Sequence, residues 1–257
     1  VLPLWGVVEQ SFTSEEEKFT LAGYRDLETS LLFHKVLWNT FEISFMATVL
    51  TLLLAYPVAY HLAKQPPRRR AFLMVLILLP FWTSILVKSF AFLVILGENG
   101  IVNQGLRWIP GVEHGIRLMF NRAGVMIGLM HFFIPFMVFP ILTSLLAQNP
   151  DLPKAAQVMG SGAARIFFRI TLPLSMPGVI AGCMLVFIIC LGFFITPELL
   201  GGRKDMMVAN IIDFYTRETL NWTFASSIAV VLLLLSGLFI FALSCVPGGR
   251  AFVEGVK

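Results

Sequence analysis

Residues 123–147 read AGVMIGLMHFFIPFMVFPILTSLLA, an apolar run without Asp, Glu, Lys or Arg. A helix that crosses a bilayer needs about 20 such residues. Windows of the same kind lie on either side of this run, and among them only 71–96 carries a charge, Lys88: the windows are 43–63, 71–96, 174–196 and 225–246. Ten-residue stretches of alternating polarity, which would indicate a membrane β-barrel, are absent. The sequence therefore predicts an all-α integral membrane protein.

The composition of the 257 residues supports this class, with 57% hydrophobic and 13% charged residues. Soluble domains have about 45–50% apolar and 25% charged residues, so a soluble enzyme, a fibrous protein and a disordered chain are all excluded. The net charge of +4 comes from short basic clusters between apolar windows, which argues against nucleic acid as a partner. The cysteines, Cys183, Cys190 and Cys245, all lie in apolar runs, and no metal site is indicated.

The first residues, Val1–Val8, form a short apolar stretch that ends before Glu9. We interpret this stretch as the outer end of a further span. The expected architecture is thus a six-span helical bundle, with its first span truncated in this sequence and a single transmembrane domain over 1–257.

The orientation of the spans is predicted from the basic turn Lys64–Arg70, which contains Arg68, Arg69 and Arg70. Short loops rich in Lys and Arg stay on the cytoplasmic side. Alternation then places 148–172 and the tail after 246 in the cytoplasm. It places 9–35, 97–122 and 197–224 outside.

The predicted cytoplasmic loop is the most unusual part of the chain and reads QNPDLPKAAQVMGSGAARIFFRITLP over 148–173. Asp151 suits the N-cap of a short helix that continues through Met159 and ends at Gly160 and Gly162. A second short helix, 163–171, leads to Pro173. Small residues such as Ala155 and Ala156 let a helix approach a partner closely, so these helices could form a knob for the groove of another protein.

The spacing of Ala155-Ala156, Gly160, Ile170 and Leu172-Pro173 resembles the loop signature, called the EAA loop, of permease subunits of binding-protein-dependent ABC importers. Lys154 stands where that family usually has Glu. The resemblance implies a type I importer permease in which 151–162 is a coupling helix that docks on the ATPase. The residues it assigns to this role are Asp151, Lys154, Ala155, Ala156, Gly160, Ile170, Leu172 and Pro173.

Further segments resemble the permeases of spermidine/putrescine importers, most of all the first of the two permeases: Pro80–Ser84, Gly97–Gly100 with Asn103, Thr196–Gly202, Asn210 and Asn221-Trp222. This resemblance implies a polyamine as the solute. Relatives that import ferric iron, opines or aminoethylphosphonate share much of the pattern and stay as alternatives.

The partners follow from the same resemblance. They are a second and different permease, two ATPase subunits that hold ATP and Mg, and an extracytoplasmic solute-binding protein, assembled in a bacterial inner membrane. The sequence has no GxxxxGK[ST] phosphate loop, so no cofactor and no ATP hydrolysis are expected on this chain. A secondary transporter and an intramembrane enzyme remain as rival classes, although a secondary transporter would need inverted repeats.

A path for a cationic solute is predicted near the outer ends of the spans. Aromatic faces and carboxylates both attract ammonium groups. The candidates are Phe81, Trp82, Phe193, Phe194, Glu198, Asp213 and Tyr215. For the aromatic residues the alternative is an interfacial belt, which requires no ligand.

Lys88 has three interpretations: it lies off the path, it pairs with Glu42, or it extends to the outer interface. Pro135 and Pro140, close to His131, predict a bend in their span. Gly178 and Gly182 allow close helix packing, either within the chain or with another subunit.

Overall fold

The computed structural model describes residues 2–13, 19–108 and 116–244, and the side chains of 4–13, 19–108 and 116–241. Every regular element in these ranges is a helix. Cys245 and the predicted cytoplasmic tail lie outside the described residues. Helices satisfy all backbone hydrogen bonds within one segment, which a chain this apolar requires in lipid.

Among the described residues, five helical segments are long and apolar enough to cross a membrane. They are Leu31–Ala63 (α3), Ile85–Leu106 (α5, Ile85–Leu96, and α6, Ile101–Leu106), Arg122–Leu146 (α7), Ala163–Leu191 (α9 and α10) and Trp222–Phe241 within α13. This confirms the all-α membrane class. Helix α1, Leu2–Ser11, has 10 residues and is too short to span by itself, so the sixth span stays a prediction.

The window 71–96 is not one continuous helix, and this prediction was wrong. Helix α4 ends at Leu78, a 3-10 turn (η1) covers Leu79–Trp82, and α5 begins at Ile85. Pro80 has no N–H to donate to the preceding turn. Thr83 and Ser84 then adopt extended backbone, with ψ of 143° and 137°. The break falls within the Pro80–Ser84 segment.

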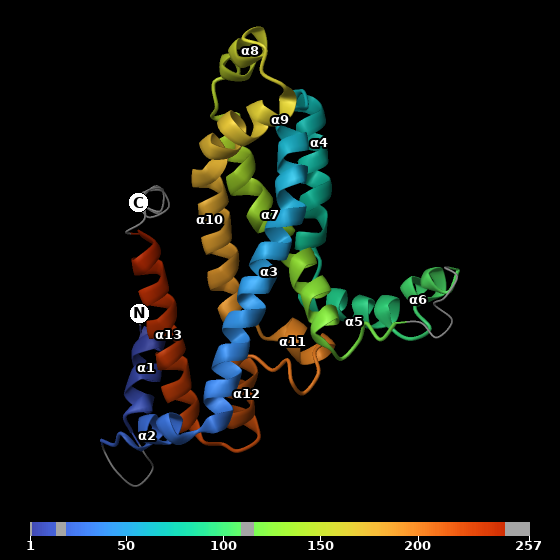
Figure 1. The fold of residues 1–257 in the computed structure, drawn as a ribbon. Coiled ribbons are helices and arrows are strands. Elements are labelled where there is room, and N and C mark those ends of the chain that lie inside the picture. The colour runs from blue at the N-terminus through green and yellow to red at the C-terminus, as the bar shows by residue number, and fades with distance from the viewer. Residues whose placement is uncertain (1, 14–18, 109–115, 245–257) are drawn as a thin grey trace. The chain divides into compact units, whose positions relative to one another are not determined.

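The chain forms two compact units. The first unit contains the described residues within Val1–Met46, Ser84–Leu129 and Ile188–Phe239. The second contains those within Ala47–Thr83, Met130–Phe187 and Ile240–Lys257. The long helices α3, α7, α10 (Leu172–Leu191) and α13 (Trp222–Ser244) contribute residues to both units (Figure 1).

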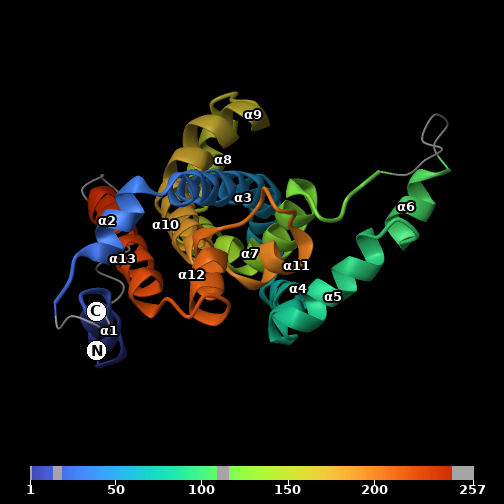
Figure 2. The same cartoon turned by 90° about the horizontal axis from the view of Figure 1, so that it is seen from below.

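A hydrophobic cluster holds together four helices of the first unit: α2 (Ala22–Thr29), the first part of α3, α12 (Val208–Arg217) and α13. Its buried members are Leu27, Phe33, Val36, Val208, Ile211, Phe224 and Ile228. Helix α1 runs beside α13 (Figures 1 and 2), and the Thr223 hydroxyl donates a 2.7 Å hydrogen bond to the Thr13 carbonyl. The hydrophobic cluster and this hydrogen bond together hold α2, α3, α12, α13 and the residues after α1 in one packed end of the first unit.

Helices α7 and α10 pack closely against each other in the second unit. A Cβ on Gly178 would lie 2.4 Å from the Pro140 carbonyl oxygen, and one on Gly182 would lie 2.8 Å from the Met137 sulfur. The glycine pair therefore packs within the chain, as one of the two interpretations held. Helix α7 continues through Pro135 and Pro140 as one element.

Candidate functional site

The loop between α7 and α10 forms two short helices, as predicted. Helix α8 covers Asp151–Val158, the chain turns at Gly160 with φ of +80°, and α9 covers Ala163–Ile166. A positive φ favours glycine, which explains Gly160 at this turn. The second helix continues as a π-helical turn (η2) over Phe167–Thr171 before α10 begins at Leu172.

The start of α8 differs from the prediction at one residue. Asp151 is the first residue of the helix and Pro150 is its N-cap, without a side-chain capping bond. The Asn149 side-chain oxygen instead accepts a 2.9 Å hydrogen bond from the Asp151 backbone N–H. Pro150, with its fixed φ, already fits the approach to the helix, so the cap position moves back by one.

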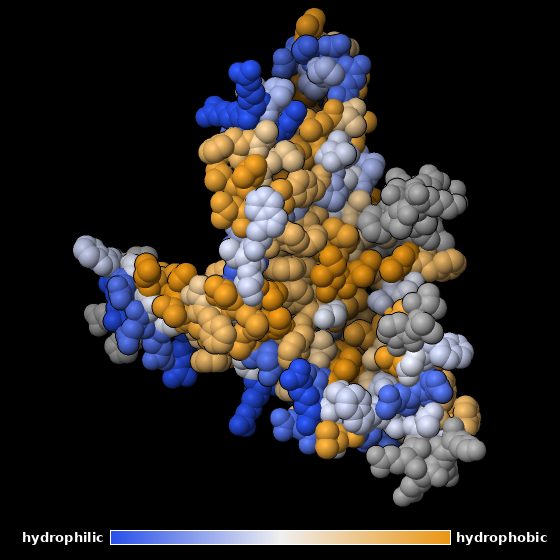
Figure 3. Space-filling view, turned by 180° about the vertical axis from the view of Figure 1, so that it is seen from behind, coloured by the Kyte–Doolittle hydropathy of each residue, from blue (hydrophilic) through white to orange (hydrophobic). Residues whose placement is uncertain are grey.

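The free end of this loop is apolar although it faces away from the helices that carry it. Val158 is 89% exposed, Met159 is 86% exposed and Leu152 is 45% exposed. Hydrophilic side chains surround this end of the second unit in Figure 3, whereas the visible faces of its spanning helices are mainly apolar. Exposed apolar side chains within a polar rim are typical of a protein-binding surface.

Lys154 forms an ion pair with Asp151 on the surface of α8, with 3.0 Å between the lysine Nζ and the carboxylate. The two side chains are 70% and 75% exposed, so water screens the pair and it contributes about 0–1 kcal/mol. Asp151 in the first turn also offsets the unfavourable position of a lysine near the helix N-terminus. Both charges stay accessible to a partner.

The base of the loop is anchored, in contrast to its tip. The Gln148 side chain donates a 3.1 Å hydrogen bond to the Thr171 carbonyl and so joins the two ends of the loop. Phe167 packs its ring edge-on against Tyr56 and Tyr60 of α3, at 5.8 and 5.4 Å between centroids. The base of the loop is therefore packed against α3.

A polar network in the first unit was not predicted. Arg122, the first residue of α7, forms ion pairs with Glu42 of α3 and with Asp205 in the connection between α11 (Ile195–Leu200) and α12. Its guanidinium also donates to the Asn39 side-chain oxygen. Glu42 is one of the predicted partners of Lys88, and the structure shows it in an ion pair with Arg122.

The same network fixes the connection between α11 and α12. The Asn39 amide donates to the carbonyls of Lys204 and Met206 at 3.1 and 2.8 Å. The Thr40 hydroxyl accepts from the Val208 N–H at 2.9 Å, and the Asp205 carboxylate accepts from the Gly202 N–H at 3.2 Å. Polar side chains of α3 thus hold a turn more than 160 residues away in sequence, with separations of 165 to 168.

The residues predicted for a solute path fall in different places. Phe81 and Trp82 belong to η1 of the second unit, where Phe81 packs edge-on against Phe136 at 5.5 Å. The other five, Phe193, Phe194, Glu198, Asp213 and Tyr215, belong to the first unit. The two groups of residues thus belong to different units, and the solute path stays a prediction.

Within the first unit, both predicted carboxylates have partners in the protein. Glu198 accepts a 2.6 Å hydrogen bond from the Asn210 amide, which also donates to the Phe194 carbonyl. Asp213 forms a 2.7 Å ion pair with Arg217, one turn further along α12. Tyr215 packs edge-on against Phe224 at 4.6 Å. A cationic ligand would have to compete with Asn210 or Arg217 for these acids.

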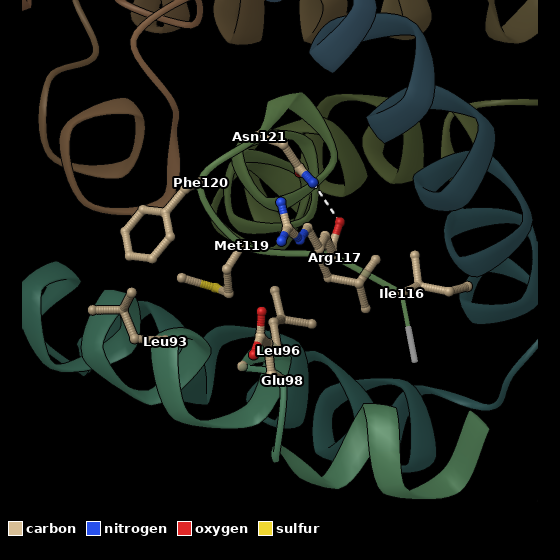
Figure 4. Close-up of a pocket in the computed structure, with 10 residues that line it drawn as sticks. Leu93, Leu96, Glu98, Ile116, Arg117, Met119, Phe120 and Asn121 are labelled. Carbon is tan, nitrogen blue, oxygen red and sulfur yellow. Dashed lines mark hydrogen bonds between the residues drawn. The ribbon is translucent and has the colours of Figure 1, made fainter. Parts of the chain in front are cut away.

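A cavity of about 570 Å³ lies in the first unit between the end of α5 and residues 116–121. Its lining is largely apolar, with Leu93, Leu96 and Met119, and Glu98 and Arg117 add one charge of each sign (Figure 4). Phe120 contributes its ring from a backbone with φ of 54°, which is unusual for a non-glycine residue. The cavity contains none of the residues predicted for the solute path.

Comparison with known families identifies the class of the protein. Residues 43–245 match the family described as binding-protein-dependent transport system inner membrane component. The match covers most of the chain, so the chain belongs to this family and is the permease of a binding-protein-dependent ABC importer. It is a multi-pass inner-membrane protein without catalytic activity of its own, since a separate ATPase subunit handles ATP.

Two individual relatives are similar to this chain over most of its length. The chain is 34% identical over 245 residues to the spermidine/putrescine transport system permease protein PotB of Escherichia coli (strain K12), covering 93% of this chain and 89% of that protein. The protein of the same name from Haemophilus influenzae is 36% identical over 222 residues, covering 86% and 77%.

Solved structures show the same fold. A bacterial ABC transporter involved in the import of the acidic polysaccharide alginate has a TM-score of 0.74 at 17% identity, covering all of this chain and 90% of that one. An inward-facing form of the MetNI methionine ABC transporter has a TM-score of 0.60 at 19% identity, covering 88% and 96%.

Proposed function

We propose that this permease imports a polyamine such as spermidine or putrescine. The supporting observation is the identity of 34–36% to permeases of spermidine/putrescine systems over 86–93% of the chain. Importers of ferric iron, opines or aminoethylphosphonate are the alternatives from the sequence. The chain acts in alternating access, in which ATP-driven closure of the ATPase subunits reorients the spans.

The coupling element of this mechanism is α8 with the turn at Gly160, on the cytoplasmic side. Support comes from the exposed apolar tip formed by Val158 and Met159 and from the anchored base at Gln148 and Thr171. An apolar tip can seat in a cleft of the ATPase, while the packed base transmits the movement to α3 and α10. Lys154 then contacts the ATPase with a positive charge in the position of the usual Glu.

The complete importer contains a second and different permease, two ATPase subunits and an extracytoplasmic solute-binding protein. The binding protein and the ATPase follow from the family; their number and the second permease are part of the proposal. A sixth span belongs to the same proposal. The hydrogen bond from the Ser227 hydroxyl of α13 to the Ser11 carbonyl at the end of α1, at 3.4 Å, supports it, because this apolar helix then lies beside a spanning helix.

The solute path contains the acids Glu198 and Asp213 with aromatic residues around them. Glu198 is exposed, and a bound ammonium group could replace the Asn210 amide as its hydrogen-bond donor. Such exchange would leave Asn210 free to bond the Phe194 carbonyl alone.

ATPase activity of the complete importer in lipid tests this proposal. We expect the solute-binding protein to stimulate hydrolysis when it is loaded with spermidine or putrescine, and Ala156→Trp with Gly160→Trp to abolish the stimulation. Stimulation by another solute alone would discard the polyamine and keep the importer. Spermidine-dependent stimulation that survives in the double variant would exclude α8 as the coupling element.

A further inference from the structure

The connection between α11 and α12 carries two adjacent cations, Arg203 and Lys204, whose side chains are exposed. We propose that these two residues form a docking point for acidic side chains of the solute-binding protein. The inference rests on the proposed function for its partner and on the predicted topology, which places 197–224 outside. It assigns a contact surface in the first unit that consists of other residues than α8 and the predicted solute path, and that lies between the path residues Glu198 of α11 and Asp213 of α12.

Buried polar side chains hold this turn in a fixed conformation. Asn39 is 8% exposed and Asp205 is 6% exposed, and both bond to the backbone around the two cations. The Asp205 N–H also donates to the Gly202 carbonyl at 2.9 Å, which closes the turn. Burying polar groups costs free energy unless they are bonded, so this network is specific to one backbone conformation. A fixed turn loses little entropy when a partner docks on it.

The charge of the turn is available to a partner. Arg122 and Arg217 have carboxylates within ion-pair distance, whereas Arg203 and Lys204 have none among the described residues. Lys35, also exposed, precedes Asn39 by one turn of α3 and therefore lies on the same helix face. We refer to Arg203, Lys204 and Lys35 together as the basic surface.

The position of the turn favours a protein partner over lipid. The α11–α12 connection lies at the end of the first unit that faces the viewer in Figure 2, together with α12 and the start of α3. The end of a helical bundle meets water, and its sides meet lipid. Importers of this family depend on a soluble binding protein, which must dock at the outer end. Opposite charges at the rim of such an interface increase the association rate and make it dependent on salt.

A titration of the importer's ATPase activity with its spermidine-loaded binding protein tests the proposal. The variant Arg203→Glu with Lys204→Glu reverses the basic surface, and Arg25→Glu with Arg107→Glu is the control with the same change in net charge on α2 and after α6. At low salt in zwitterionic lipid we expect about a tenfold higher half-saturating concentration for the first variant, at an unchanged maximal rate. The difference should shrink at high salt, and the control should match the wild type.

Arg203→Gln with Lys204→Gln should give an intermediate value, and size-exclusion profiles of all variants verify assembly. Equal half-saturating concentrations for the reversal variant, the control and the wild type would overturn the proposal. A change that follows the anionic lipid content rather than the binding protein would assign the surface to lipid headgroups and also overturn it. If the spermidine-loaded protein does not stimulate even the wild type, the polyamine proposal fails and the docking proposal is tested in a second titration. That titration uses the binding protein of the solute that does stimulate hydrolysis, with the same variants and the same criteria.

Discussion

Removal of the Arg122 side chain should destabilise the first unit strongly, because it leaves a buried carboxylate without its partner. Asp205 has a side-chain exposure of 9%, against 30% for Arg122, and the Arg122 Nε lies 3.3 Å from the Asp205 Oδ1. Breaking a buried ion pair by removing one partner costs about 3–5 kcal/mol. Water can partly replace an arginine that is 30% exposed, so we expect a cost of about 2–3 kcal/mol for Arg122→Ala.

The assay is thermal unfolding of the purified chain in detergent at one fixed scan rate, since membrane proteins often unfold irreversibly. At about 2–4 °C per kcal/mol for a chain of this size, the apparent Tm should fall by about 4–12 °C. The control is Arg217→Ala, which breaks a pair whose arginine is 75% exposed. A pair of this kind, one turn apart on a helix, contributes about 0.3–0.5 kcal/mol, so its Tm should change by about 2 °C or less.

A double variant separates the charge effect from loss of packing. Arg122→Ala with Asp205→Asn removes the uncompensated charge, so it should recover part of the lost Tm. Equal Tm values for Arg122→Ala and Arg217→Ala would refute the reasoning that this network is a buried element of the fold.

Three further predictions concern packing and coupling. Gly178→Ala should lower the folded yield and the Tm, because the added Cβ would lie 2.4 Å from the Pro140 carbonyl oxygen. The control Gly237→Ala, whose Cβ would have nothing within 4 Å, should leave both unchanged or raise the Tm slightly. Equal yields and Tm values for the two variants would contradict the close packing of α7 and α10. Met159→Asp should reduce ATPase binding at least tenfold in a pull-down while leaving the Tm within about 1 °C, because the side chain is 86% exposed; unchanged binding would exclude the tip from the contact. Lys154→Glu, which restores the usual family residue, should change both the affinity of the ATPase and the coupled hydrolysis rate, and no change in either would show that the charge at this position is not used.

Local sequence signals predicted the elements better than their connections. The apolar run 123–147 corresponds to α7 within one residue at each end, because length and hydropathy alone define such a helix. The turn at Gly160 was predicted from another local signal, since glycine commonly ends a helix. The break at Pro80 was missed because hydropathy does not register a proline in an otherwise apolar window, although the proline itself was a readable signal.

The Arg122 network could not be predicted, because it depends on contacts distant in sequence. Arg122 bonds residues 80 and 83 positions away, and nothing in the neighbouring sequence distinguishes it from an ordinary interfacial arginine. The partners of Glu198 and Asp213 are nearer, at 12 and 4 residues, and the helical spacing of Asp213 and Arg217 was a signal that could have been read. Glu198 and Asp213 were selected for their charge and their position in the sequence. Neither property predicts whether another side chain of the protein already binds the carboxylate.

Uptake of radiolabelled spermidine into proteoliposomes tests the central claim most directly. The complete importer is reconstituted with ATP inside and spermidine-loaded binding protein outside, and the matched sample carries Ala156→Trp with Gly160→Trp. We predict accumulation that requires both ATP and the binding protein and that is lost in the double variant. Accumulation under an ion gradient without ATP, or ATP-dependent accumulation that the double variant retains, would contradict the account.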